Sequence, residues 1–401
     1  MIHQTDCLGH FPVAIILPDL LIELAGDLYL FVFASSLSNV DLTTIKNFIC
    51  RRRKSKAMTD RITAGYVTQN QYNIGNAFID IGALEQIDSA LDRAFEQYEL
   101  VPVSDHSLLN SSIPTPLRKI TNPLWRFVED KVPRGIIDRL LERSLGGEHK
   151  FNLIEQYDFD FLFISGCVLT LPYFHIHRKL LENISESSTT LIFIGAGSNS
   201  YSNYEQKYLS KILSKIDTSL MISRDRTAYD YYGEFFDYTM DGIDSAFFVN
   251  KIEYSEPPMA LDEYSVLTFD KYKSMEKEKK VMREVEKTYD IIQACHAPHP
   301  VRSFRSIEPR DEDFVSDLPE DYLRLYANAE EVHSDRIHAC VPTIALGGRC
   351  MLHNESLRAP MFEKVTSGNI TQQVVRKSGL EEVQREQVEF LADRLTDLDE
   401  K

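Results

Sequence analysis

The chain has 401 residues, which is more than one domain of ordinary size and enough for two. Hydrophobic residues make up 43% of it and charged residues 26%, which excludes global disorder, a collagen-like fibre and a disulfide-stabilised miniprotein. The formal net charge is −17, so the surface repels nucleic-acid phosphate and we expect no nucleic-acid partner. An anionic small substrate is still compatible with this charge, because a local cluster of arginines can outweigh it.

The N-terminal segment differs from the rest of the chain. Residues 11–37 are strongly apolar, but a proline and three acidic residues interrupt them, namely Pro18, Asp19, Glu23 and Asp27. Charges near the centre of a bilayer are costly and no basic residue precedes the run, so we expect neither a transmembrane helix nor a signal peptide. Our hypothesis is that residues 1–57 are a dispensable extension or a start-site artefact outside the native fold.

From Arg61 onward, short apolar runs alternate with helical periods. The runs predict strands, and apolar side chains spaced three or four residues apart predict helices between them. The predicted strands cover residues 62–69, 100–104, 159–166, 189–197, 219–223 and 244–249. The predicted helices cover residues 73–98, 136–145, 178–185, 205–216 and 226–236. Nearly continuous apolar strands joined through helices indicate a parallel sheet covered on both faces.

A second alternating unit follows a Pro-rich, acidic segment, residues 252–263, which we interpret as a linker. Its predicted strands cover residues 264–270, 330–334 and 349–353, and its predicted helices cover 282–294, 320–329 and 336–347. A charged helical segment near the end, residues 381–395, is expected to cross back to the first unit.

The predicted fold class is therefore α/β, with two doubly wound Rossmann-like domains facing each other across a cleft. The predicted organisation is an extension (1–57), an N-terminal Rossmann-like domain (58–250), a C-terminal Rossmann-like domain (262–379) and a C-terminal helix (380–401). Ligands in such sheets bind outside the carboxyl ends of the strands, so the candidate residues are sought there.

Three glycine-containing turns follow predicted strands. The first is Asn73-Ile74-Gly75-Asn76, the second is Ser165-Gly166-Cys167, and the third contains Gly195 and Gly197. Glycine at such a turn lets a ligand approach the backbone and the helix N-terminus, although a helix cap or a tight turn explains it equally well. The dinucleotide fingerprint GxGxxG is absent.

Arg224 follows the strand 219–223, and Asp225 is placed to cap the next helix. An arginine at the rim of a cleft suits a carboxylate or a phosphate, while the alternative is a salt bridge to a neighbouring acid.

The most specific pattern surrounds Ser334, Arg336 and His338. A strand is predicted to end at Ser334 and a helix to begin at Asp335, which places Arg336 and His338 in the first helical turn. A cation and an imidazole beside free backbone donors suit an anion whose chemistry needs a proton. The alternative is an exposed turn with capping contacts.

Other kinds of site have less support. The pairs His175/His177, His296/His299 and His333/His338 lack further ligands at established spacing, and Asp158-Phe159-Asp160 precedes a strand instead of following it, so no metal site is predicted. The six cysteines have no CxxC spacing, which indicates free thiols in a reducing cytoplasm: Cys7, Cys50, Cys167, Cys295, Cys340 and Cys350.

The order of motifs resembles the polysaccharide pyruvyl transferase family over residues 62–365. The motifs are NIGNAF, FISGCVLT, IGAGSNS, ISRDRTAYDYY with DGIDSAFF, and VHSDRIHACVPTIALG. The resemblance implies a GT-B-type enzyme that moves a pyruvyl group from phosphoenolpyruvate onto a sugar, usually as a cyclic ketal, and releases phosphate. It implies no metal or organic cofactor, and an acceptor that is a sugar or a lipid-linked glycan.

Residue roles are carried over by motif. Arg336 and His338 resemble the residues that hold phosphoenolpyruvate in the second domain, with Ser334 beside them and Arg224 at the entrance to that domain. Asn73, Gly75 and Asn76 resemble an acceptor-side turn, and Gly195 and Gly197 lie in another turn at the cleft. His338 is the candidate acid, or it steadies the departing phosphate. The base that accepts the hydroxyl proton is unassigned, with Asp225 and Asp244 as candidates.

The sequence also departs from the family pattern. Ile337 replaces a usual Leu, Asn76 replaces a common Asp, Cys167 adds bulk to a Gly-rich turn, and Ser245 replaces a Pro. Two alternatives stay open: a nucleotide-sugar glycosyltransferase on the same scaffold, and a non-catalytic carbohydrate-binding relative. The expected location is the cytoplasm, with peripheral contact at the inner membrane face where lipid-linked acceptors are built.

Overall fold

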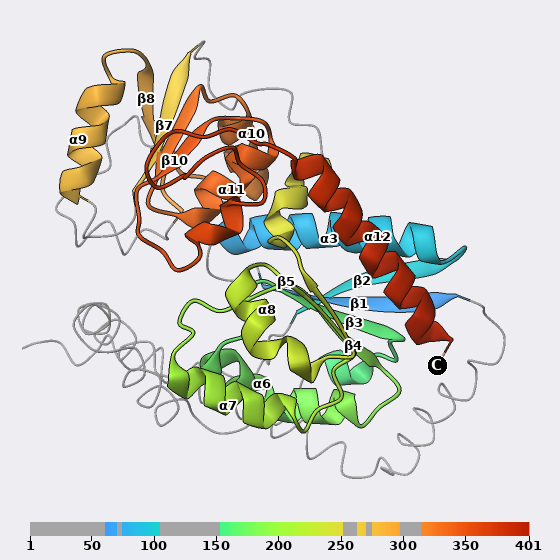
Figure 1. Cartoon of the computed structure of the whole chain (residues 1–401). Helices are drawn as coiled ribbons and strands as arrows, with labels where there is room; N and C mark the ends of the chain where they lie inside the picture. Colours follow the sequence, from blue (N-terminus) through green and yellow to red (C-terminus); the bar gives the residue numbers. More distant parts are fainter. Residues whose placement is uncertain are drawn as a thin grey trace, which may run out of the picture. The chain divides into compact units, whose positions relative to one another are not determined.

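Two parallel sheets organise the chain from Arg61 onward (Figure 1). The computed structural model describes residues 61–69, 74–104, 153–251, 263–269, 275–296 and 314–400. The predicted extension 1–57, the predicted helix 136–145, Asn73 and most of the linker lie outside the described residues. Residues 61–401 form one unit, so the contacts within it are discussed together.

The first sheet has six strands in the order β2-β1-β3-β4-β5-β6, all parallel. They are β1 (Ile62–Thr68), β2 (Tyr98–Ser104), β3 (Phe161–Ser165), β4 (Thr190–Ala196), β5 (Leu220–Ser223) and β6 (Tyr238–Asp241). The second sheet has four parallel strands in the order β10-β9-β7-β8. They are β7 (Tyr264–Thr268), β8 (Asp290–Gln293), β9 (Glu331–Ser334) and β10 (Cys350–Leu352).

Helices cover both faces of the first sheet. Alternate residues of its strands therefore pack into different hydrophobic clusters, one on each face. Phe161 and Phe163 of β3 pack with α3 (Ile74–Ala94), whereas Leu162 and Ile164 pack with helices of the opposite face. Those helices are α6 (Leu171–Ser185), α7 (Asn203–Leu213) and α8 (Arg226–Tyr232). A period-2 strand buried on both faces is apolar throughout, as β3 is. The predicted doubly wound sheet is confirmed.

The second sheet is covered in the same way. Val266 and Val332 pack with α10 (Pro319–Ala327) and α11 (Ile337–Ala345), while Leu267 packs with Val285 at the end of α9 (Met275–Val285) on the other face. The predicted class, α/β with two doubly wound sheets, is therefore confirmed by the sheet order and by the helices packed on both faces of each sheet.

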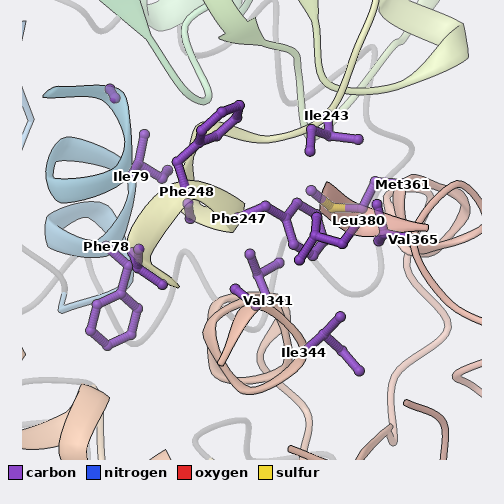
Figure 2. Close-up of a cluster of buried hydrophobic side chains, with 14 of the residues drawn as sticks. Phe78, Ile79, Ile243, Phe247, Phe248, Val341, Ile344, Met361, Val365 and Leu380 are labelled. Atoms are coloured by element: carbon purple, nitrogen blue, oxygen red, sulfur yellow. The ribbon is translucent and has the colours of Figure 1, made fainter. Parts of the chain in front are cut away.

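One hydrophobic cluster connects the two sheets (Figure 2). Phe78 of α3, Phe247 of the 3₁₀ helix η5 (Ser245–Lys251) and Val341 of α11 belong to it, and all three are fully buried. Phe247 also packs edge-on against Phe362 of the 3₁₀ helix η8 (Ala359–Phe362). Each fully buried side chain of this size contributes roughly 1.5–3 kcal/mol, so this contact holds the two sheets together strongly.

The C-terminal helix α12 (Leu380–Asp399) returns to the first sheet and runs alongside α3 (Figure 1). Glu389 pairs with Arg93 of α3 at 3.2 Å. Buried Gln387 accepts a hydrogen bond from the backbone N of Ile243 at 2.8 Å and donates one to its carbonyl at 3.3 Å. This helix therefore fixes the segment that directly precedes Asp244.

Several predicted elements need correction. Residues 244–249, predicted as a strand, form η5, because the Asp244 carboxylate accepts the Ala246 N–H and the following apolar residues are buried between α3 and α11. The helix predicted over 282–294 is wrong in its second half, where the run Asp290–Gln293 is strand β8. Strand β6 was missed, since its four residues are only half-buried and carry no apolar run. Short apolar segments do not distinguish a strand from a helix by periodicity.

Candidate functional site

The candidate residues lie at the carboxyl ends of strands in both sheets, and those that follow β9 lie at the point where the strand order of the second sheet reverses. The first sheet reverses its strand order between β1 and β3, and the second between β7 and β9. Ligands of open α/β sheets bind outside the carboxyl ends of strands at such points. Ser334 ends β9, and Arg224 and Asp244 follow β5 and β6.

Arg224 is buried, with 1% of its surface exposed, and it does not lie at an open rim as expected. Its Nη1 donates to Asp244 Oδ2 at 3.2 Å, and its Nη2 donates to the Ser198 carbonyl at 3.0 Å. The side chain passes over Gly197, where an added Cβ would lie 2.6 Å from Nε. The alternative of an internal salt bridge is therefore the observed one, and both terminal nitrogens of the Arg224 guanidinium are used within the protein.

The carboxylate of Asp225 is also engaged in hydrogen bonds within the protein. It caps α8 as predicted, since its Oδ1 accepts the Ala228 N–H at 2.9 Å. The hydroxyl of Tyr201 lies 2.9 and 2.7 Å from its two oxygens and accepts the N–H of Ser198 at 3.0 Å. Burial, followed by the charge of Asp225, raises the pKa of Tyr201 strongly, so this hydroxyl stays protonated. These contacts leave Asp225 poorly placed to accept a proton from a substrate.

Asp244 connects the two sheets chemically. Its Oδ1 accepts the Ala246 N–H at 3.0 Å, and its Oδ2 lies 3.5 Å from His338 Nε2 in the first turn of α11. Burial alone would raise the pKa of this carboxyl, but His338, Arg224 and the Ala246 N–H outweigh burial and hold the pKa well below its usual range. Asp244 is therefore ionised throughout the physiological range.

His338 is buried, and burial lowers its pKa below the ordinary 6.5, although Asp244 opposes that shift. We therefore assign it as neutral at neutral pH, with the proton on Nε2 facing the carboxylate, a tautomer inferred from this contact. Among the described residues, its Nδ1 has no hydrogen-bond partner. The backbone at His338 departs from helical geometry, with φ −80° and ψ 15°.

Ser334 and Arg336 build the turn before α11. The Ser334 hydroxyl donates to the Thr268 carbonyl at 2.8 Å and accepts the Arg336 N–H at 2.8 Å. Helix α11 begins at Ile337, so Arg336 is the N-cap and does not belong to the first helical turn as predicted. Its side chain is half-buried. The serine thus fixes the backbone from which Arg336 and His338 project.

Sequence reasoning missed Arg358. This half-buried residue precedes η8, and burial followed by the charge of Arg224 lowers its pKa. The same electrostatic field acts on His338, whose pKa Arg358 also lowers. Among the described residues, the guanidinium has no hydrogen-bond or ion-pair partner. An unpaired arginine close to a second arginine and a histidine is arranged to receive an anion. No motif spacing in the sequence marks this position.

The N-terminal turn lies at the carboxyl end of β1, and Gly75 and Asn76 begin α3. Asn76 Nδ2 donates to the Gln69 carbonyl at 3.3 Å, and Asp80 accepts the Gln69 N–H at 2.9 Å and the Tyr66 hydroxyl at 2.6 Å. The structure thus gives Asn76 a role in holding Gln69 against the start of α3. Asn73 lies outside the described residues.

Gly195 serves packing. Its φ is +53°, and an added Cβ would lie 2.5 Å from Ser245 Oγ, so glycine is needed where β4 meets η5. Gly195 and Gly197 together let η5 and Arg224 approach the end of β4. The close approach that suggested a ligand is made by the protein itself.

In the part of the chain that the structure describes, no group of three or more His, Cys, Asp or Glu side chains suits a metal ion. His333 does not pair with His338; its Nδ1 lies 3.0 Å from Nε2 of His353. None of the helices described is long and apolar enough to cross a membrane.

Several solved structures are partly similar to the chain. The S. aureus MnaA–UDP complex has a TM-score of 0.46 at 11% identity, with 84% of this chain and 91% of that chain covered. UDP-GlcNAc 2-epimerase from Methanocaldococcus jannaschii has a TM-score of 0.44 at 12% identity, covering 83% and 93%. UDP-N-acetylglucosamine 2-epimerase from Rickettsia bellii has a TM-score of 0.44 at 11% identity, covering 84% and 95%. The fold assignment above depends on the sheet order and not on these similarities.

No curated protein matches the chain. A family model does match it, and the match runs from the N-terminal turn to the end of β10, so it includes the candidate residues Arg224, Asp244, Arg336 and His338. The model is that of polysaccharide pyruvyl transferase, it covers residues 73–352 and hence most of the chain, and the protein therefore belongs to the polysaccharide pyruvyl transferase family.

Proposed function

We propose that the protein transfers the pyruvyl group of phosphoenolpyruvate to hydroxyls of a sugar in a cell-surface polysaccharide or glycan, with formation of a ketal and release of phosphate. Family membership supports pyruvyl transfer in polysaccharide biosynthesis. The observation that carries the donor assignment is the position of His338 against ionised Asp244, with the unpaired guanidinium of Arg358 in the same electrostatic field.

The donor carries a carboxylate and a phosphate, so it needs at least two cationic groups. Arg358 supplies a planar fork of donors that the protein has not used, and Arg336 lies at the N-cap of α11, where backbone N–H groups and the helix dipole also favour an anion. Arg224 acts differently from its expected role: it is bound to Asp244 and positions that carboxylate. In this proposal Arg336 and Arg358 hold the donor.

The chemistry begins with a proton. An acid adds a proton to C3 of the enol, the adjacent C2 becomes oxocarbenium-like, and a sugar hydroxyl forms a bond to C2 while losing its proton. The C2–O bond to phosphate then breaks, phosphate departs with the bonding electrons, and a second hydroxyl adds to C2 with loss of its proton to close the ketal. Two hydroxyl protons are released and one proton enters the methyl group, so the remaining proton leaves with phosphate or solvent.

His338 is the residue proposed to supply the first proton, through Nδ1. The contact with Asp244 keeps the ring oriented and stabilises the imidazolium that forms before transfer. A bound anion would raise the pKa of the buried ring and so charge it only when donor is present. A positioned acid of this kind contributes roughly 100- to 10,000-fold to the rate. The proposal places the reaction in the cytoplasm, at the inner membrane face, without a metal or organic cofactor.

Calorimetry with phosphoenolpyruvate and a panel of nucleotide sugars tests this function without knowledge of the acceptor. We expect phosphoenolpyruvate to bind wild type and to lose most of its affinity in Arg336→Ala. The exposed variant Arg385→Ala is the control, since its side chain lies on the outer face of α12. Binding of a nucleotide sugar with no response to phosphoenolpyruvate would instead favour a glycosyltransferase. Binding of neither would contradict the donor assignment.

A further inference from the structure

A cavity of about 690 Å³ lies beside η8, between the turn that precedes this helix and residues 366–371. This volume falls within the range of small-molecule sites, roughly 300–1,000 Å³. The residues on either side of Arg358, Leu357 and Ala359, line the cavity, whereas Arg358 itself does not. Arg358, which we assign to the donor, is therefore carried by the same segment that lines the cavity, although Arg358 does not line it.

The charge of the lining excludes the donor. Two carboxylates, Glu355 and Glu363, line the cavity, and among the described residues that line it none is basic. Both side chains are exposed and neither has an ion-pair partner within the described part of the chain. A ligand with a carboxylate and a phosphate is repelled by such a lining, while hydroxyl groups donate to carboxylates in charge-assisted hydrogen bonds.

The lining also offers donors. Asn369 Oδ1 accepts hydrogen bonds from Thr371 N at 2.9 Å and Thr371 Oγ1 at 2.8 Å, which fixes the orientation of the amide. Its Nδ2 is therefore the free end, and no described residue accepts from it. Carboxylate acceptors and an amide donor around one cavity match a sugar, because each of its hydroxyls both donates and accepts.

Apolar surface completes the lining. Leu357 is 66% exposed at the cavity, and Ala359, Pro360 and Phe362 also line it, although the side chain of Phe362 is buried. A sugar ring has an apolar C–H face that the exposed side chain of Leu357 can cover. The mixture of apolar surface and a few convergent polar groups is typical of small-molecule sites.

We propose that this cavity binds an uncharged sugar unit of the acceptor glycan, next to the unit that receives the pyruvyl group. That the bound sugar belongs to the acceptor rests on the proposed function, whereas the sugar site itself is inferred from the lining of the cavity. A glycan held there lies beside the segment that carries Arg358, so the site would set which glycan is presented to the donor.

Saturation-transfer NMR on the full chain tests the proposal, with the methyl glycosides of glucose, galactose, mannose and N-acetylglucosamine as probes. At least one is expected to bind wild type, and E355Q/E363Q should weaken it about tenfold or more, since charge-assisted hydrogen bonds are about twice as strong as neutral ones. Methyl glucuronide should bind more weakly than methyl glucoside. The matched control is E276Q/E284Q, which removes two exposed charges from α9.

The proposal is overturned if none of the four glycosides binds wild type, or if E355Q/E363Q binds them as wild type does. Calorimetry with phosphoenolpyruvate is run on the same samples, and E355Q/E363Q should keep the donor affinity. If phosphoenolpyruvate fails to bind wild type while a glycoside binds through Glu355 and Glu363, the donor assignment fails and the cavity stands. If the donor binds and no glycoside depends on those carboxylates, the cavity proposal alone fails.

Discussion

The carboxylate of Asp244 lies 3.5 Å from Nε2 of His338, although Asp244 follows the last strand of the first sheet and His338 begins a helix of the second. The same carboxylate oxygen accepts from Arg224. The buried carboxylate of Asp244 thus contacts both the guanidinium of Arg224 and the imidazole of His338, which come from different parts of the chain. The two sheets are joined by this polar contact as well as by the hydrophobic cluster around Phe247.

Asp244→Asn should therefore lower both stability and activity. The substitution removes the nearer of the two carboxylates that pair with buried Arg224 and leaves only Asp225, 3.9 Å from Nε, which costs about 3 kcal/mol in the free energy of unfolding. Urea denaturation measures this loss. The control is Asp230→Asn, which removes the partner of Arg226 at an exposed ion pair of 2.8 Å and should cost at most about 1 kcal/mol. The double variant Arg224→Met/Asp244→Leu should be more stable than Asp244→Asn. Equal losses from Asp244→Asn and Asp230→Asn would contradict the role given to Asp244.

Arg358→Ala should separate binding from stability. Since this guanidinium has no partner among the described residues and Arg224 lies in its field, its removal should leave the thermal midpoint unchanged or raise it. The affinity for phosphoenolpyruvate should fall about tenfold or more, because a charge-assisted contact is lost. Arg358→Lys should recover part of the affinity, as it keeps the charge but not the planar fork. A variant with lower stability and normal donor affinity would show that Arg358 is structural instead.

The sequence predicted the layers of this fold better than its interfaces. Continuous apolar strands such as β3 predicted a sheet buried on both faces, and Asp225 was correctly predicted to cap α8. The burial of Arg224 was not predictable, because its partner Asp244 lies 20 residues away in a segment mistaken for a strand. Arg358 carries no local signal either: its importance comes from the electrostatic field that it shares with Arg224 and His338, which arises only in the folded chain.

Donor binding should be coupled to uptake of a proton by His338. Burial lowers the pKa of the free ring below 6.5, and a bound anion would raise it. Between those two pKa values the complex holds one more proton than the free protein, so affinity should increase as pH falls and decrease as it rises. Calorimetry of phosphoenolpyruvate binding near pH 7.5, in buffers of different ionisation enthalpy, counts the protons. His338→Gln should remove the part of the uptake due to the protein and leave that of the phosphate. An identical count in both proteins would exclude His338 as the proton carrier.

His333 and His353 should make the protein sensitive to acid. Their ring nitrogens lie 3.0 Å apart, so one ring donates to the other and both are neutral in the native state. Burial, then the charges of His333 and Lys277, lower the pKa of His353 to about 3, and burial lowers the pKa of His333 although Glu331 opposes that shift. In the unfolded chain both rings bind a proton near pH 6.5.

Because the pKa values of His333 and His353 are lower in the native state than in the unfolded chain, acid destabilises the native state. The contribution to stability is complete above about pH 6.5, and it is lost as pH falls toward the native pKa, by about 1.4 kcal/mol per pH unit for each ring. Urea denaturation from pH 8 to pH 4 measures the slope. His353→Gln keeps a hydrogen-bonding group next to His333 but does not titrate, so the slope should be shallower than in wild type. The difference in the free energy of unfolding between wild type and His353→Gln at pH 8 reports packing alone and serves as the baseline. Parallel stability curves for the two proteins between pH 8 and pH 4 would show that His353 does not contribute to acid sensitivity.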